Sequence, residues 1–194
     1  MNRNNQLISL VIAALLCAVG IVIPMFAPRI VFEPVSFTLA SHVPIFIALF
    51  ISPPVALTVT LGSTVGFFFA GLPLVIVLRA LSHLIFVAIG SVLLKKNPNF
   101  LSTVTGMVAY GMILAVIHAA SEVAVVTWFY FGNSMTKSYY TYGYLVSVLV
   151  LGIGTIIHSM VDFGIAVLVW RPVTHVIQIP VSVKSLPKRK QAVL

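Results

Sequence analysis

Residues 74–94 read LVIVLRALSHLIFVAIGSVLL, an apolar run whose only ionisable side chains are Arg79 and His83. A helix needs about 20 such residues to cross the hydrocarbon core of a bilayer, so the run predicts a membrane-spanning helix. A charged side chain at that depth costs at least ~2.5–3.5 kcal/mol and persists only where it faces protein, water or a ligand. The same stretch therefore predicts the fold and marks a place to look for function.

The composition of the whole chain agrees with that stretch. Of its 194 residues 60% are hydrophobic and 7% are charged, and the mean hydropathy is +1.16, well above that of soluble domains. At about 20 residues per span there is room for about six helices. We therefore expect an all-α membrane protein with six transmembrane helices. The single cysteine, Cys17, excludes a disulfide framework and a paired-cysteine metal motif.

Proline, glycine and charged residues divide the chain into six expected spans. They cover residues 7–26, 38–51, 55–70, 74–94, 101–131 and 142–170. We expect residues 1–171 to form one transmembrane domain and residues 172–194 to form a basic cytoplasmic tail. The first span has no small-residue cleavage site after it and is expected to be a retained helix rather than a signal peptide.

Lysine and arginine are enriched on the cytoplasmic side of membrane proteins, and this bias predicts the orientation. With both termini in the cytoplasm, eight basic residues lie inside and only Arg29 and Lys137 lie outside. The eight are Arg3, Lys95, Lys96, Arg171, Lys184, Lys188, Arg189 and Lys190. The bias accounts for the net charge of +8 without a nucleic-acid partner, and the tail from Lys184 is expected near anionic lipid headgroups.

This orientation places two long loops outside, at residues 27–37 and 132–141, the second preceded by a run of four aromatic residues at 128–131. Longer, aromatic-rich loops on one face indicate that a ligand binds there. For Trp128 and Tyr144 the alternative is a place in the aromatic belt at the membrane interface.

Three ionisable pairs occur at i, i+4 spacing, which puts both members on one face of a helix. They are Arg79/His83, His118/Glu122 and His158/Asp162. At ~1.5 Å per residue, Arg79 lies about 8 Å and Glu122 about 14 Å below the outer ends of their helices, and His42 lies shallower still. We expect Arg79, His83, Glu122 and His42 to line one cavity that opens outward. The deeper pair, His158 and Asp162, is interpreted as structural or coupling.

An arginine in such a cavity favours a planar anion, because a carboxylate can accept two parallel hydrogen bonds from the guanidinium. The alternative is an internal ion pair between Arg79 and Glu122 that only holds two helices together. Both can hold in turn, with Glu122 bound to Arg79 in the ligand-free protein and a ligand carboxylate displacing it.

Enzyme chemistry finds no support in the sequence. There is no His-Glu-x-x-His motif, no Cys/His cluster and no Walker motif, and residues 62–64 (Gly-Ser-Thr) with a distant His158 are too weak a signal for an intramembrane protease. We expect no ATPase activity, no resident metal and no cofactor, so any transport is powered by another protein.

Several stretches carry a family resemblance. They are IPMF at 23–26, EPVSFTLASH at 33–42, FISP at 50–53 and LRALSH at 78–83, together with Ala14 and Ala18 in the first span. Nearly the whole chain, through Trp170, resembles the S components, the substrate-binding membrane subunits, of energy-coupling factor vitamin transporters, and most resembles their niacin branch. Neighbouring branches bind hydroxymethylpyrimidine, pyridoxine or pantothenate.

The resemblance implies a high-affinity vitamin site on the extracellular side, roofed by the loop after the first helix. It also implies that Ala14 and Ala18 dock onto a membrane T subunit driven by two ATPase subunits, and that the S component topples in the membrane to carry its ligand inward. The expected location is the cell membrane of a Gram-positive bacterium.

Niacin agrees with the chemistry of the residues. Arg79 can bind its carboxylate, and His83 or His42 can hydrogen-bond that carboxylate or the ring nitrogen. One of three aromatic residues is expected to stack on the ring, namely Phe37, Trp128 or Tyr139. Neutral hydroxymethylpyrimidine or pyridoxine would instead use Glu122 and the histidines, and pantothenate would need a larger pocket.

Two other classes of protein stay open. A secondary transporter would need internal repeats or broken helices at the midplane, and no repeat relates the two halves of this chain. A structural membrane protein would keep the buried pairs but show no stabilisation by a ligand.

Overall fold

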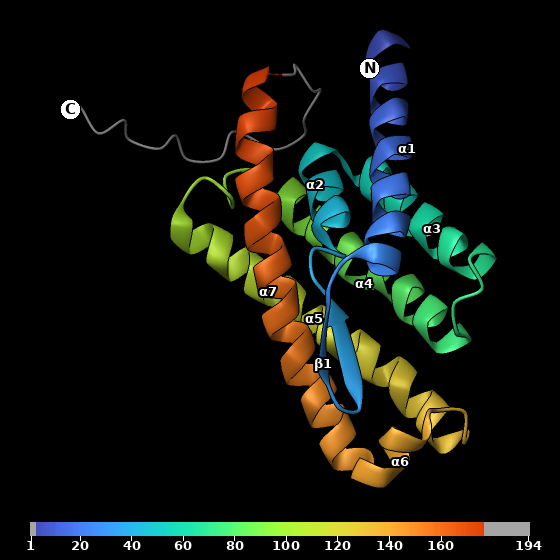
Figure 1. Ribbon diagram of the computed structural model, residues 1–194. Helices are drawn as coiled ribbons and strands as arrows, with labels where there is room; N and C mark the ends of the chain where they lie inside the picture. The colour runs from blue at the N-terminus through green and yellow to red at the C-terminus, as the bar shows by residue number, and fades with distance from the viewer. Residues whose placement is uncertain (1–2, 177–194) are drawn as a thin grey trace.

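The computed structural model describes residues 3–176, which form seven helices and one β hairpin (Figure 1). In chain order these are α1 (Arg3–Phe26), β1 (Arg29–Phe32), β2 (Val35–Thr38), α2 (Val43–Ile51), α3 (Pro53–Phe69), α4 (Leu74–Lys96), α5 (Val104–Phe131), α6 (Lys137–Tyr142) and α7 (Tyr144–Val176). The helical class expected from the sequence is confirmed. The basic tail from Lys184 lies outside the described residues, and α7 continues past the expected domain boundary at 171.

Four helices, α1, α4, α5 and α7, are long and apolar enough to cross a membrane. Helix α3 is apolar but has only 17 residues. The expected span at 38–51 is wrong, because Thr38 ends β2 and only the nine residues of α2 are helical. At ~1.5 Å per residue α2 is about 14 Å long, too short to cross by itself. The six-span count and the side on which each terminus lies stay predictions.

The two expected outer loops contain regular structure. Residues 29–38 form the antiparallel hairpin, in register Arg29↔Thr38, with Val35 and Phe37 turned inward and the whole of β1 exposed. Residues 137–142 form α6. The first expected loop is therefore a regular antiparallel hairpin rather than an irregular segment.

Short polar signals set the ends of the helices. Ser52 separates α2 from α3 and accepts a hydrogen bond from the Val55 N–H (3.4 Å), while the prolines at 53 and 54 occupy the first turn, where no donor is needed. Thr103 caps α5 in the same way through the Gly106 N–H. Lys95 and Lys96 end α4, where positive charge is favoured by the helix dipole.

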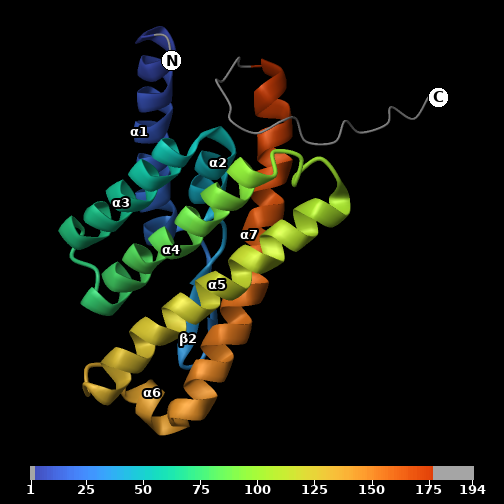
Figure 2. The same ribbon diagram turned by 180° about the vertical axis from the view of Figure 1, so that it is seen from behind.

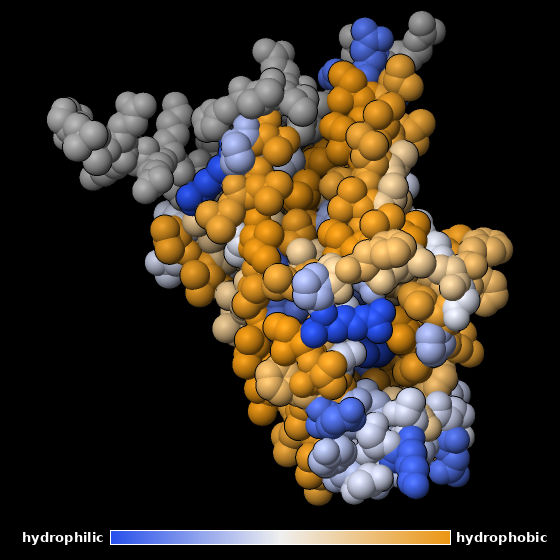
Figure 3. All heavy atoms as spheres, in the orientation of Figure 1, coloured by the Kyte–Doolittle hydropathy of each residue, from blue (hydrophilic) through white to orange (hydrophobic). Residues whose placement is uncertain are grey.

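Helices α4, α5 and α7 pack in sequence, with α3 against α4 and α1 against α3; the hairpin lies along α7 (Figures 1 and 2). Aromatic rings fill the centre, where Phe163 makes edge-on contacts with Phe46 and Phe50 at centroid distances of 5.4 and 5.9 Å. The outward-facing side chains are mostly apolar, and hydrophilic atoms gather around α6 and in a hollow where α1 leads into β1 (Figure 3). This distribution fits a protein surrounded by lipid.

The contact between α1 and α3 depends on the absence of side chains. A Cβ at Gly62 would lie 2.6 Å from the Cys17 Sγ, and a Cβ at Gly66 would collide with the Ile21 side chain. These glycines therefore allow α1 and α3 to approach closely, as small residues do in membrane helix pairs.

Candidate functional site

A cavity of about 300 Å³ lies under the hairpin and is lined from α1, the hairpin, α2, α3, α4, α5 and α7. Its volume is at the lower end of the ~300–1,000 Å³ typical of small-molecule sites. The lining includes five of the residues selected from the sequence: Arg79, His83, Glu122, His42 and Phe37. Tyr139 lines an adjoining cavity of about 340 Å³, which also reaches Arg79.

Trp128 is not brought to this site. Its side chain is 81% exposed and lines neither cavity, so the geometry leaves stacking on a ligand to Phe37 and Tyr139. Phe37 is buried with its ring 5.4 Å from that of His158, and Gly154 of α7 lies directly against it. Burial raises the pKa of the Tyr139 phenol, which therefore stays a neutral group.

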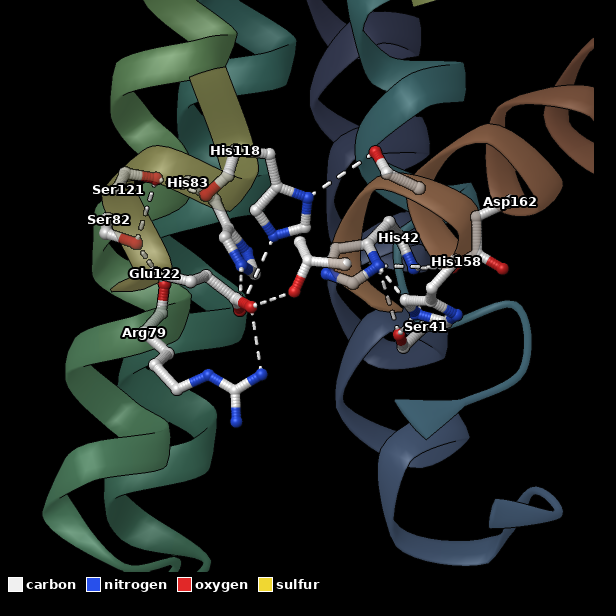
Figure 4. A network of polar contacts seen from close by, with 12 residues as sticks. Ser41, His42, Arg79, Ser82, His83, His118, Ser121, Glu122, His158 and Asp162 are labelled. Carbon is white, nitrogen blue, oxygen red and sulfur yellow. Dashed lines mark hydrogen bonds and ion pairs between the residues drawn. The ribbon is translucent and has the colours of Figure 1, made fainter. Parts of the chain in front are cut away.

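One half of the polar network centres on Glu122 of α5 (Figure 4). Arg79 Nη2 donates to Glu122 Oε2 at 2.9 Å, and Thr155 Oγ1 of α7 donates to the same oxygen at 2.9 Å. The other oxygen, Oε1, lies 3.4 Å from Nε2 of both His83 and His118. The i, i+4 pairs on α4 and α5 thus face each other and join three helices through one carboxylate.

The other half centres on Asp162 of α7. Its carboxylate accepts the backbone N–H groups of Ala40 (2.8 Å) and His42 (2.9 Å), and its Oδ2 lies 3.1 Å from His42 Nδ1 and 3.3 Å from His158 Nε2. Asp162 is fully buried and satisfies backbone groups that precede α2, which is where a carboxylate is most favourable. It holds the end of the hairpin and the start of α2 against α7.

The separation of His158 and Asp162 from the other site residues is wrong. His158 lines the cavity, and Asp162 contacts His42 directly. The depth argument placed His42 near the outer end of a long span. Because residues 29–38 form a hairpin and α2 begins only at Val43, His42 lies in the interior at the level of Asp162.

Two features of the site were missed in the sequence. His42 lies at ring-centroid distances of 4.6–4.9 Å from His83, His118 and His158, a cluster that brings together residues from four separate segments. Arg29, interpreted only as a topology signal, lines the cavity with its guanidinium donating to Pro24 O at 3.0 Å. The depth argument and the resemblance of segment 33–42 both pointed to His42 as a cavity residue, but neither predicted the cluster.

Apolar outer surfaces and an interior polar cavity define a class, the multi-pass membrane protein with a polar cavity among its helices. No family model matches the chain, and no solved structure does. A curated protein, the niacin transporter NiaX of Lactococcus lactis subsp. cremoris, is 39% identical over 166 residues, covering 84% of this chain and 73% of the relative. The chain belongs to the family of this niacin transporter, and its resemblance to the niacin branch of S components is confirmed.

Proposed function

We propose that this protein is the substrate-binding S component of an energy-coupling factor importer and that its ligand is niacin, as the nicotinate anion. The observation that carries the proposal is the carboxylate already held by Arg79 beside the cavity, that of Glu122 at 2.9 Å. The similarity to a niacin transporter supports the same ligand.

Binding proceeds by exchange of carboxylates. The nicotinate carboxylate takes the place of Glu122 on the guanidinium, and Glu122 keeps the hydrogen bond from Thr155 (2.9 Å) and its contact with His83 (3.4 Å). The pyridine ring then lies under the hairpin, where Phe37 provides an apolar face.

Delivery depends on partners. Ala14 and Ala18 lie on an exposed face of α1. Helix α1 is also the least buried of the four long helices: 17% of its most apolar segment is buried, against 22–39% for the other three. Small residues on an open helix face allow another helix to approach closely. We propose that a T subunit with two ATPase subunits docks there, and that the cavity opens to the extracellular side.

The test is a binding panel on the purified protein with nicotinate, nicotinamide, hydroxymethylpyrimidine, pyridoxine and pantothenate, measured by calorimetry and thermal shift. Nicotinate should bind tightest. Because Arg79→Ala removes a charge-assisted contact worth about 1.5–3 kcal/mol, nicotinate affinity should fall roughly 10–150-fold. Nicotinamide binding should change less.

Lys137→Ala serves as the matched control, since Lys137 is exposed on α6 and lines neither cavity. A folded Arg79→Ala protein that binds nicotinate like the parent would refute the anchor role. If nicotinate affinity falls in Arg29→Ala and not in Arg79→Ala, Arg29 is the residue that binds the carboxylate. If a neutral vitamin binds more tightly than nicotinate, that vitamin rather than niacin is the ligand.

A further inference from the structure

Three buried histidines converge beside the cavity. His42 immediately precedes α2, His83 lies on α4 and His118 on α5. One ring nitrogen of each lies within 4.8 Å of the other two. His42 and His83 also line the cavity, whereas His118 is fully buried and does not.

Two of the three rings are oriented by an oxygen on their Nδ1 atom (Figure 4). His42 Nδ1 lies 3.1 Å from Asp162 Oδ2, and His118 Nδ1 lies 3.4 Å from Ser159 Oγ. Histidines that bind metals use the same arrangement, in which one ring nitrogen donates to an oxygen and the other coordinates the ion. This leaves Nε2 of His42 and His118 available as ligands.

The Nε2 atom of His118 supplies an independent observation. It is buried, and among residues 3–176 it has no hydrogen-bond partner. Glu122 Oε1 lies 3.4 Å away, outside hydrogen-bond geometry. With the ring proton on Nδ1, facing Ser159, the buried Nε2 lone pair faces this carboxylate oxygen, an arrangement that a cation satisfies and that a neutral interior does not.

The charges around the cavity are compatible with a cation. With neutral histidines, the polar network contains two carboxylates, Glu122 and Asp162, and one guanidinium, Arg79, and the guanidinium of Arg29 lies on the cavity wall outside the network. These groups together carry no net charge, so a bound nicotinate would leave one negative charge, and buried uncompensated charge is unfavourable. A divalent cation beside the carboxylate would offset that charge.

We propose that His42, His83 and His118 form a three-histidine site for a divalent transition-metal cation of the zinc class, with its remaining coordination position toward the cavity. Imidazole nitrogen is a preferred ligand for such ions, and three histidines with one open position is a known zinc arrangement. Zn–N bonds of ~2.0–2.1 Å in a tetrahedral site put the ligand atoms about 3.3 Å apart, so the rings close inward by side-chain rotation. Glu122 lies beside the ion and Asp162 orients His42. The fourth ligand would be the nicotinate carboxylate, a step that rests on the proposed function.

The experiment uses the full chain without a polyhistidine tag. Metal is removed with a chelator, Zn²⁺ or Co²⁺ is added alone, and bound metal is measured by elemental analysis and by the visible absorption of Co²⁺ in a tetrahedral site. We expect one ion per chain. His118→Gln should abolish binding, and Ser159→Ala, which only removes the oxygen beside His118 Nδ1, should weaken it roughly 10–100-fold. Lys137→Gln on the exposed α6 is the control, and His158→Gln, a change in the neighbouring group of His42, His158 and Asp162, should also keep the ion.

Each other outcome overturns a stated part. A parent protein that takes up no Zn²⁺ and gives no Co²⁺ absorption has no such site. Metal that survives His118→Gln but is lost in His158→Gln belongs instead to the group of His42, His158 and Asp162. Metal binding without nicotinate binding refutes the proposed function and leaves the metal site standing. If nicotinate binds with equal affinity with and without metal, the ion takes no part in nicotinate binding.

Discussion

At the scale of single residues, the site depends on how the positive charge of Arg79 is compensated. Its guanidinium is partly buried and its Nε atom has no hydrogen-bond partner among the described residues, so the 2.9 Å contact with Glu122 is its main compensation. An ion pair of this kind is weak proof of stability, because desolvation offsets much of the attraction. Removing one partner is different, since it leaves the other charge buried and unpaired.

Glu122→Gln should therefore destabilise the ligand-free protein by about 3–5 kcal/mol. A carboxylate ligand fills the vacancy on Arg79, so nicotinate should raise the melting temperature of Glu122→Gln more than that of the parent. Thermal unfolding measures both, at ligand concentrations set to the same multiple of each dissociation constant. Glu33→Gln makes the same change on an exposed turn and should match the parent. Equal ligand-induced rises would deny Glu122 the role of internal counter-ion.

Residue spacing could predict part of this site. The i, i+4 pairs identify which side chains share a helix face, and the pairing of Arg79 with Glu122 follows once α4 and α5 are neighbours. The histidine cluster could not be predicted in this way. It depends on the crossing of α5 with α7 and on the depth of His42, and neither is set by spacing within one helix.

At the scale of secondary-structure elements, long apolar runs with proline or glycine at their ends predicted α1, α3, α4, α5 and α7 close to their observed bounds. The hairpin and the short α2 were not predicted. The start of α2 is set by Asp162 of α7, which binds the Ala40 and His42 N–H groups from a distant part of the sequence. A tertiary contact of that kind leaves no local pattern.

The hairpin is held over the cavity by Phe37 packing on Gly154 of α7. In Gly154→Ala the new Cβ would collide with the Phe37 ring, an overpacking that costs about 1–3 kcal/mol of unfolding free energy. Nicotinate affinity should fall with it, because the ring is displaced from the cavity wall. Chemical denaturation and calorimetry measure the two effects.

Two further glycines of α7 provide controls for that change. A Cβ at Gly152 would lie 3.7 Å from the nearest atom, Val123 Cγ2, and a Cβ at Gly164 would have no neighbour within 4 Å. Alanine at either position should leave stability and binding near those of the parent. If Gly154→Ala binds nicotinate as tightly as Gly164→Ala does, Phe37 is not part of the binding surface.

At the scale of the whole molecule, α1 differs from the other long helices. It packs on α3 and α2 through one face, where Ala13 is buried and Gly62 and Gly66 of α3 make the close approach. Its opposite face, with Ala14 and Ala18, is exposed among apolar side chains. The two sets of small residues therefore differ: the α3 glycines pack the fold internally, whereas the α1 alanines stay exposed and form the proposed docking surface.

Leucine at Ala14 or Ala18 should block that partner without disturbing the site. We expect nicotinate uptake by cells to fall strongly while nicotinate affinity of the isolated protein stays near normal, because membrane helix association depends on close packing of small residues. Ala88→Leu adds the same bulk to an exposed position of α4 and should preserve both activities. Gly66→Leu adds bulk where α3 meets Ile21, so it should lower stability and with it both uptake and binding. Radiolabelled uptake, calorimetry and co-purification with the T subunit distinguish these cases. If Ala14→Leu lowers ligand binding as Gly66→Leu does, the α1 alanines serve internal packing and the docking surface lies elsewhere.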